Sequence, residues 1–150
     1  MPEIALNDLL IREITAGDAT AAAGLSEELG YPVSPDTMRQ RIEFLNRSGG
    51  HVVYIACLAG DVVGWIDVRE THHLQVEPCA EIGGLVVAGG ARGGGVGRCL
   101  IERAEHWAMQ RGLERVIVRS RLEREAAHRF YLRQGYARTK TSAVFTKNLG

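Results

Sequence analysis

The spacing of apolar residues along the chain predicts two amphipathic helices. One begins at Ser34 and Pro35, a typical helix start, and an apolar residue recurs every three or four positions before Gly49 and Gly50 end it. The other runs over residues 96–111 and ends at Gly112, with charged residues on one side and a single apolar face made of Val96, Leu100, Ala104, Trp107 and Ala108. This second helix is expected to pack its apolar face on a sheet.

Runs rich in β-branched residues predict the strands. Segments 51–58 and 62–69 form a hairpin across Ala59, Gly60 and Asp61, and the other expected strands are 9–14, 80–87, 115–120, 136–139 and 144–146. An Ala-rich helix capped by Thr15 or Asp18 stops near Gly30, and another helix covers 123–134 before Gly135. The predicted order is βααβββαβαββ. It implies an α/β (α+β) fold with a mixed sheet of about six to seven strands and helices on both faces.

Length and composition fit one globular domain. The chain has 150 residues, of which 45% are hydrophobic and 24% charged, so it can build one hydrophobic core and is not expected to be disordered. The sequence shows no repeat, linker or low-complexity tract. We therefore expect residues 1–150 to form a single domain.

The charge balance argues against polyanionic partners. Eighteen basic residues match eighteen acidic ones, so no global field is available to hold nucleic acid or an anionic membrane. No run approaches the about 18 apolar residues that a membrane helix needs, and Met1, Pro2 and Glu3 lack the features of a signal peptide. A cytoplasmic protein is expected.

The three cysteines, Cys57, Cys79 and Cys99, are widely spaced in apolar stretches, which favours buried, reduced thiols over a disulfide framework. A zinc site made of His72, His73 and Cys79 is the alternative. Its ligand spacing matches no standard pattern, so no metal is expected.

The most informative segment is the glycine cluster between residues 81 and 98, which follows a predicted strand and opens a predicted helix. Glycines let backbone N–H groups converge on an anion, and the helix N-terminus adds about half a positive charge. Such a loop suits a pyrophosphate.

Two common phosphate loops do not fit this cluster. A P-loop requires lysine followed by serine or threonine after its last glycine, and no glycine of this chain precedes that pair. The dinucleotide pattern G-x-G-x-x-G meets Arg98 when started at Gly93 and Leu100 when started at Gly95. The next strand ends at Val118 and Arg119 instead of an acid, so a dinucleotide-binding redox protein is excluded.

The cluster resembles the R/Q-x-x-G-x-G/A motif of the GNAT acetyltransferase superfamily through Arg92, Gly95 and Gly97. A merely flexible loop is the alternative, but the similarity extends to both sides and to a second signature in residues 124–136, so that it covers nearly the whole chain from Leu9. The matching positions around the loop are Leu85, Val87, Arg92, Gly93, Gly95, Val96, Gly97, Leu100 and Ile101, and those of the second signature are Ala127, Phe130, Tyr131, Gly135 and Tyr136.

The resemblance implies acetyl-CoA as the acyl donor. The backbone of Leu85, Val86 and Val87 is then expected to pair with the pantetheine arm and to polarise the thioester carbonyl. The diphosphate is expected on the loop and its flanking arginines, namely Arg92, Gly93, Gly94, Gly95, Val96, Gly97 and Arg98. For Arg92 and Arg98 the alternative is solvated surface charge.

Two positions depart from the family pattern. Gly89 stands where the family often has proline, which is expected to leave the loop more mobile. Arg124 stands where it often has asparagine, so one cofactor contact is expected to differ.

Glu81 is the candidate general base. Alternation along the strand places it on the same face as Gly83, Leu85 and Val87. An alkylammonium has a pKa near 10.4, so removing its proton at neutral pH costs about 4 to 5 kcal/mol, and a carboxylate acting through water is one way to do so. The alternative is that Glu81 only pairs with an arginine.

Tyr131 is the candidate general acid, because the resemblance places it where the family keeps a tyrosine next to the departing sulfur. A phenol with a pKa near 10 is a weaker acid than a thiol near 8.5, so hydrogen-bond donation to the thiolate is its minimum role. The alternatives are a tyrosine that only packs against the cofactor, and His128, one helical turn away, as the proton donor.

The expected reaction is direct attack of a primary amine on acetyl-CoA in a ternary complex. The acceptor is expected to be a small molecule or a peptide, and His72 and His73 lie in the hairpin where they could meet it or be ordinary loop residues. A non-catalytic acetyl-CoA sensor is the alternative function. A homodimer is common in the family.

Overall fold

The computed structural model describes residues 6–150, which divide into two compact units, one ending at Arg119 and the other spanning Ser120–Gly150. Each unit is described by itself. Met1, Pro2 and Glu3, on which the argument against a signal peptide rests, lie outside the described residues.

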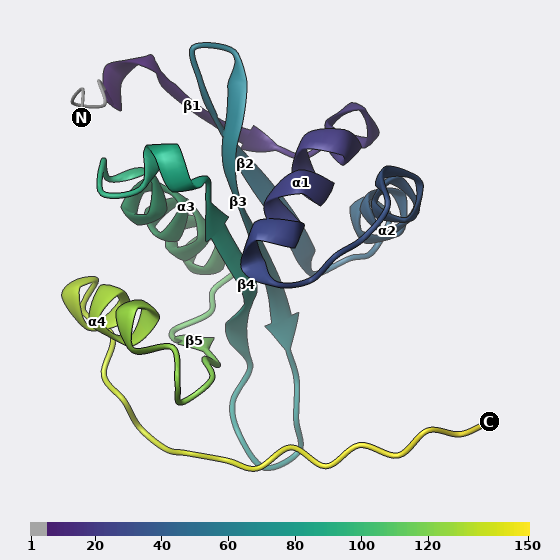
Figure 1. The fold of residues 1–150 in the computed structure, drawn as a ribbon. Coiled ribbons are helices and arrows are strands. Elements are labelled where there is room, and N and C mark those ends of the chain that lie inside the picture. The colour runs from purple at the N-terminus through teal and green to yellow at the C-terminus, as the bar shows by residue number, and fades with distance from the viewer. Residues whose placement is uncertain (1–5) are drawn as a thin grey trace. The chain divides into compact units, whose positions relative to one another are not determined.

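The first unit is built on a five-stranded mixed sheet (Figure 1). Its strands follow the chain order, with antiparallel neighbours except for the last, parallel pair. They are β1 (Leu9–Glu13), β2 (His51–Leu58), β3 (Asp61–Thr71), β4 (Cys79–Val87) and β5 (Val116–Val118). The hairpin predicted from residues 51–69 is confirmed.

Helices cover both faces of this sheet, as predicted. On one face α1 (Ala19–Leu29) and α2 (Pro35–Asn46) bury a core that joins Ala22 and Ile42 to Val53 and Ile55 of β2. On the other face lies α3 (Val96–Gln110), whose fully buried Leu100 reaches Gly64 of β3 so closely that a Cβ there would lie 3.2 Å from it. No helix among residues 6–150 has the length and apolar character needed to cross a membrane.

The helix boundaries follow from local chemistry. The hydroxyl of Ser34 accepts a hydrogen bond from the Thr37 N–H at 3.1 Å, and Pro35 occupies the first helical position. At the end of α1, Gly30 adopts a left-handed conformation with φ +101°. Both ends agree with the sequence prediction.

The second unit contains α4 (Glu125–Arg133), which ends at Gln134 before the left-handed Gly135. The predicted strands 136–139 and 144–146 are wrong, because residues 136–150 form neither helix nor strand. A strand needs a partner for its backbone groups, and this segment gains little from burial since Val144 and Phe145 are almost fully exposed. The sheet therefore has fewer strands than predicted.

A β-bulge in β4 corrects the predicted orientation of its residues. Asp67 pairs with Gly84 while Val68 pairs with Ile82, so Gly83 is the extra residue and the alternation shifts by one. Glu81 consequently shares its face with Gly84 and Val86, whose partners Asp67 and Trp65 lie on the α1 side of the sheet. Leu85 and Val87 pair with Ile66 and Gly64 on the α3 side, opposite to the expectation.

The start of α1 is held by a buried carboxylate. Asp18 accepts hydrogen bonds from both Nη atoms of Arg12 at 2.9 Å and from the N–H of Thr15 at 2.8 Å. The bonds from Arg12 hold the pKa of Asp18 below its ordinary value, although burial alone would raise it. This network ties β1 to the first helix.

Replacing Asp18 by asparagine is expected to lower the free energy of unfolding by about 1 to 3 kcal/mol, since a buried charge-assisted network is lost. A lowered folded-state pKa stabilises the protein above the unfolded pKa, and this contribution disappears as the pH falls through the folded pKa. Denaturant titrations at pH 7 and at steps below pH 5 measure both effects. Asp36→Asn on exposed α2 is the control; an equal loss in both variants would contradict the prediction.

Candidate active site

The glycine cluster forms a loop that ends at the N-terminus of α3. Gly93 and Gly95 adopt left-handed conformations with φ +81° and +88°, and the first helical bond runs from the Cys99 N–H to the Gly95 carbonyl. The N–H groups of Val96, Gly97 and Arg98 come before this first helical donor and have no acceptor within the helix, and the first turn carries no acidic residue. This geometry can hold a diphosphate at the positive end of the helix dipole.

The two predicted anion-binding arginines turn toward their own neighbours. The Nε of Arg92 donates to the Val87 carbonyl at 3.0 Å, and Nη1 of Arg98 lies 3.4 Å from Glu102. Both residues are exposed. Their contact with a cofactor stays a prediction.

Gly89, the first departure from the family pattern, lies in a short 3-10 turn, Gly89–Ala91. Its N–H, which a proline would lack, donates to the Glu28 carboxylate of α1 at 3.1 Å. The turn is also held by the Ala88 N–H, which donates to the Val63 carbonyl at 2.8 Å. Gly89 therefore adds a contact between the loop and α1, a feature that the sequence did not indicate.

The end of β4 has a free edge next to the glycine loop. β5 pairs with Ala80, Glu81 and Ile82 and stops at Val118. Beyond that point Leu85, Val86 and Val87 pair with β3, and no strand among the described residues pairs with their other edge. An extended ligand can add to such an edge through backbone hydrogen bonds. The predicted contact of these residues with a pantetheine arm fits this arrangement and stays a prediction.

Glu81 is buried and held by two arginines. Its Oε2 accepts from Nη2 of Arg69 at 2.8 Å, and its Oε1 accepts from Nε of Arg119 at 3.0 Å. Burial alone would raise the pKa of Glu81, but the bonds from Arg69 and Arg119 outweigh it and hold the pKa below its ordinary value. A carboxylate in this state has a lowered proton affinity. The contacts favour the ion-pair alternative, while the role of base stays a prediction.

The sequence analysis missed a histidine–aspartate pair on the same face. His51 of β2 binds Asp67 of β3 through Nε2 and Oδ1. The other carboxylate oxygen faces the bulge, where a Cβ on Gly83 would lie 3.3 Å from it, and a Cβ on Gly84 would clash with Trp65 at 2.8 Å. The sequence offered one indication of this pair: Asp67 is a charged residue in an otherwise apolar part of the predicted strand.

In the second unit, Tyr131 belongs to an aromatic group on α4. Its ring lies 5.4 Å from that of Phe130, edge to face, and 6.1 Å from that of Tyr136. Burial raises the pKa of Tyr131, and the charge of Arg124 offsets part of this rise. The phenol therefore stays protonated at neutral pH, as a proton donor must be.

His128, the alternative donor, is already engaged. Its Nε2 donates a hydrogen bond to the Arg121 carbonyl at 2.8 Å, so the Nε2 proton is already held within the second unit. This contact makes His128 a weaker candidate than Tyr131.

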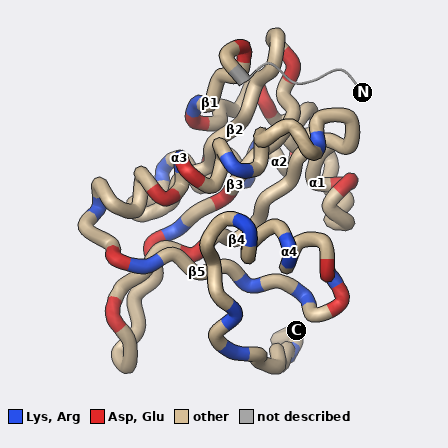
Figure 2. The backbone as a smooth tube through the Cα atoms, turned by 90° about the vertical axis from the view of Figure 1, so that its left-hand side faces the viewer, with Lys and Arg blue, Asp and Glu red and all other residues tan. Residues whose placement is uncertain are grey.

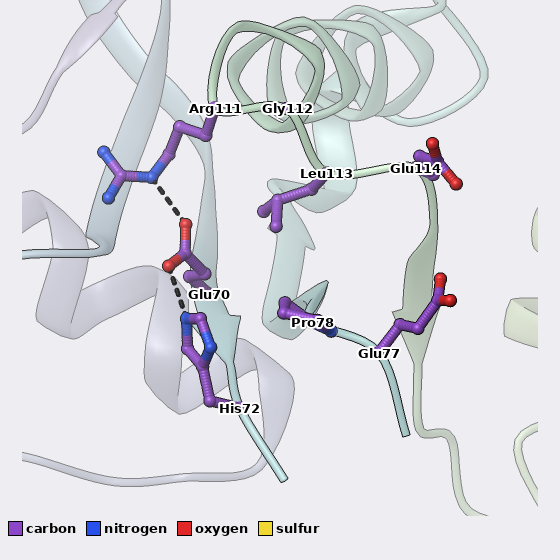
Figure 3. Close-up of a pocket in the computed structure, with 8 residues that line it drawn as sticks. All are labelled: Glu70, His72, Glu77, Pro78, Arg111, Gly112, Leu113 and Glu114. Carbon is purple, nitrogen blue, oxygen red and sulfur yellow. Dashed lines mark hydrogen bonds and ion pairs between the residues drawn. The ribbon is translucent and has the colours of Figure 1, made fainter. Parts of the chain in front are cut away.

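A cavity of about 430 Å³ lies at the opposite end of α3 from the glycine loop. Figure 3 shows Glu70 between Arg111 and His72, with Glu77 and Glu114 on the facing wall. With 15 residues in α3, the two ends are about 22 Å apart. The cavity is therefore separate from the predicted diphosphate site, and His72 forms part of its wall.

The three cysteines differ in burial. Cys57 and Cys79 are buried and Cys99 is half-buried, all three as free thiols. Residues 6–150 contain no group of three histidine, cysteine, aspartate or glutamate side chains arranged to hold a metal ion.

Acidic and basic residues are interspersed along the backbone (Figure 2).

Comparison with known proteins identifies the family. The acetyltransferase (GNAT) family matches residues 19–136. The aminoalkylphosphonate N-acetyltransferase of Salmonella typhimurium is 38% identical over 96 residues, which are 63% of this chain and 61% of the relative. The chain thus matches less than two thirds of that relative's length.

Solved structures share the fold. The aminoglycoside 6'-N-acetyltransferase AAC(6')-Ih from Acinetobacter baumannii superposes with a TM-score of 0.83 at 20% identity, covering 95% of this chain and 99% of that one. AAC(6')-Iy, in complex with the bisubstrate analogue CoA-S-monomethyl-acetylneamine, gives 0.83 at 18% identity, with 94% and 99% covered. The predicted mixed α/β fold is confirmed, with five strands in place of the expected six to seven. Since the family match includes the glycine loop and α4, the chain belongs to the acetyltransferase (GNAT) family.

Proposed function

We propose that the protein transfers the acetyl group of acetyl-CoA to the primary amine of a small molecule, by direct attack in a ternary complex. The observation that carries this proposal is the sequence of three features along one stretch of chain: the free edge of β4, the glycine loop and the uncapped start of α3. Together they offer backbone groups for an extended arm and then for a diphosphate.

In the proposed reaction, separate groups of residues bind the diphosphate, orient the thioester and assist the leaving group. The N–H groups of Val96 and Gly97 bind the diphosphate, and the edge from Leu85 to Val87 orients the thioester. Acetyl-CoA supplies the activated acyl group. The amine nitrogen forms a bond to the acetyl carbon as the C–S bond breaks, and Tyr131 donates a hydrogen bond or its proton to the departing sulfur.

The incoming ammonium must lose a proton before attack, which costs about 4 to 5 kcal/mol at neutral pH for a pKa near 10.4. Glu81 has both carboxylate oxygens bonded to guanidinium groups and a lowered pKa. In the proposed reaction the ammonium therefore loses its proton to solvent water, and the role of Glu81 as the base remains a prediction.

The relatives support a small molecule as the acceptor. One is an aminoalkylphosphonate N-acetyltransferase and others are aminoglycoside N-acetyltransferases, so we propose a small-molecule amine instead of a peptide. Cytoplasmic location, a homodimer and the lack of nucleic-acid partners remain predictions. An acetyl-CoA sensor without turnover is the second candidate, since it would use the same loop.

Calorimetric titration with acetyl-CoA, with NADH as the control ligand, tests the loop. We expect micromolar binding of acetyl-CoA alone, followed by release of free thiol when amines are added. Binding without thiol release for any amine would favour the sensor, and no binding at all would refute both functions.

A further inference from the structure

Two guanidinium groups converge on one carboxylate at the point where β4 and β5 separate. Arg69 extends from β3 and Arg119 follows β5, and both bind Glu81 of the strand between them. The side chain of Glu81 is 11% exposed, whereas those of Arg69 and Arg119 are 55% and 59% exposed. The carboxylate is thus enclosed while the cations face outward.

The cluster carries more positive charge than its carboxylate neutralises. One guanidinium would balance Glu81, and the second leaves a net charge of about +1. Each guanidinium has five N–H donors; Arg69 uses its Nε and Nη2 on Glu81, and Arg119 uses its Nε. Among residues 6–150, no other carboxylate pairs with either arginine. Most of their donors remain free for a further anion.

The groups facing the cluster complete its charge pattern. Arg69 is the register partner of His51, whose ring is occupied by Asp67. The second carboxylate oxygen of Asp67 lies beside the bulge at Gly83, and Asp67 is two residues before Arg69 on the same face. A molecule with an anionic end and an ammonium end finds opposite charges for both along this face.

The cluster also lies at a suitable place relative to the free edge. Ile82 is the last β4 residue paired with β5, and Glu81 precedes it. Leu85, the first residue of the free edge, is four residues beyond Glu81, or about 13 Å along the strand at about 3.3 Å per residue. A short bifunctional amine, together with the reach of an arginine side chain, spans this distance.

We propose that Arg69 and Arg119 bind the anionic group of the acceptor, a phosphonate or carboxylate carried by a short primary amine. Guanidinium groups match the oxygens of both anions with paired N–H donors. Glu81 then acts as a positioning residue that holds the two guanidiniums side by side. This inference rests on the proposed function and gives it a substrate class.

A purely structural tie between strands is the competing explanation. Half-exposed ion pairs contribute little to stability, so a structural role alone does not account for two outward-facing cations on one buried acid. The two explanations predict different kinetics, because only the anion site depends on the charge of the acceptor.

The test compares acceptors matched in length with the full chain: 2-aminoethylphosphonate, 3-aminopropanoate and the uncharged-ended propylamine. Arg69→Gln and Arg119→Gln are each expected to raise KM for the anionic amines about 10- to 100-fold and to reduce the preference for anionic amines over propylamine by the same factor, while KM for acetyl-CoA stays within about twofold. Arg119→Lys should recover part of the loss. Arg39→Gln, which also removes an arginine placed between two carboxylates on α2, is the control and should change none of these values.

Ethylphosphonate, which has no amine to acetylate, tests the anion site by binding alone. It should compete with the anionic amines in the unmodified protein and bind in calorimetry, and Arg119→Gln should weaken that binding at least tenfold. Equal losses for charged and uncharged amines, or no ethylphosphonate binding, would overturn the anion site. If thiol release is absent with every amine while ethylphosphonate still binds through Arg119, the transferase proposal fails and the anion site stands.

Discussion

Replacing Gly95 by valine is expected to lower the affinity for acetyl-CoA by at least about 100-fold. Gly95 has φ +88° and immediately precedes α3, so a β-branched residue strains the backbone by about 1 to 3 kcal/mol. It also places methyl groups next to the first N–H groups of the helix, the proposed binding site of the diphosphate. Losing two charge-assisted hydrogen bonds of about 1.5 to 3 kcal/mol each is enough for the expected change, and calorimetry measures it.

The other end of the same helix provides a matched control. Gly112 has φ +74°, and a Cβ there would have no atom within 4 Å. Gly112→Val therefore introduces similar backbone strain about 22 Å from the loop, and should lower thermal stability without changing the affinity for acetyl-CoA. If both variants weaken binding alike, the loss is one of folding, and the loop has no special role.

Local chemistry made most elements predictable. Proline, serine and glycine at the ends of α2 and α1 act through their own backbone or through neighbours three residues away, so their effects can be read from a short window of sequence. The hairpin between β2 and β3 was predictable for the same reason. Each of these features depends on residues close together in the chain.

Features that depend on distant partners could not be predicted in the same way. The bulge at Gly83 exists only in the pairing of β4 with β3, and a simple alternation therefore assigned Leu85 and Val87 to the wrong face. The predicted strands after Tyr136 failed because apolar residues such as Phe145 indicate a strand only where a partner edge covers them. Tertiary context decides both cases.

The candidate site shows the same division. The loop around Gly95 was found because its anion-binding capacity belongs to one continuous segment. Arg69 and Arg119, by contrast, lie 50 positions apart in numbering and meet only because β3 and β5 flank the strand that carries Glu81. The sequence analysis gave pairing with an arginine as the alternative to a general base for Glu81, and the sheet brings two arginines to it.

Replacing Tyr131 by phenylalanine is expected to lower kcat about 100-fold while KM for acetyl-CoA changes less than threefold, because loss of a positioned proton donor typically costs 10² to 10⁴ in rate. The ring and its contacts with Phe130 and Tyr136 are retained, so packing on α4 is preserved. Steady-state kinetics with a saturating amine measure the change.

The pH profile separates a proton donor from a tyrosine that only packs. Burial raises the pKa of Tyr131 above its ordinary value near 10, so the donating form persists at neutral pH and kcat should fall only as the pH rises through that raised pKa. The phenylalanine variant should lack this alkaline decline. Tyr54→Phe, which removes a phenol from β2 beneath Arg103, is the control and should keep both the rate and the decline. An unchanged kcat in Tyr131→Phe would show that the phenol only packs against its neighbours.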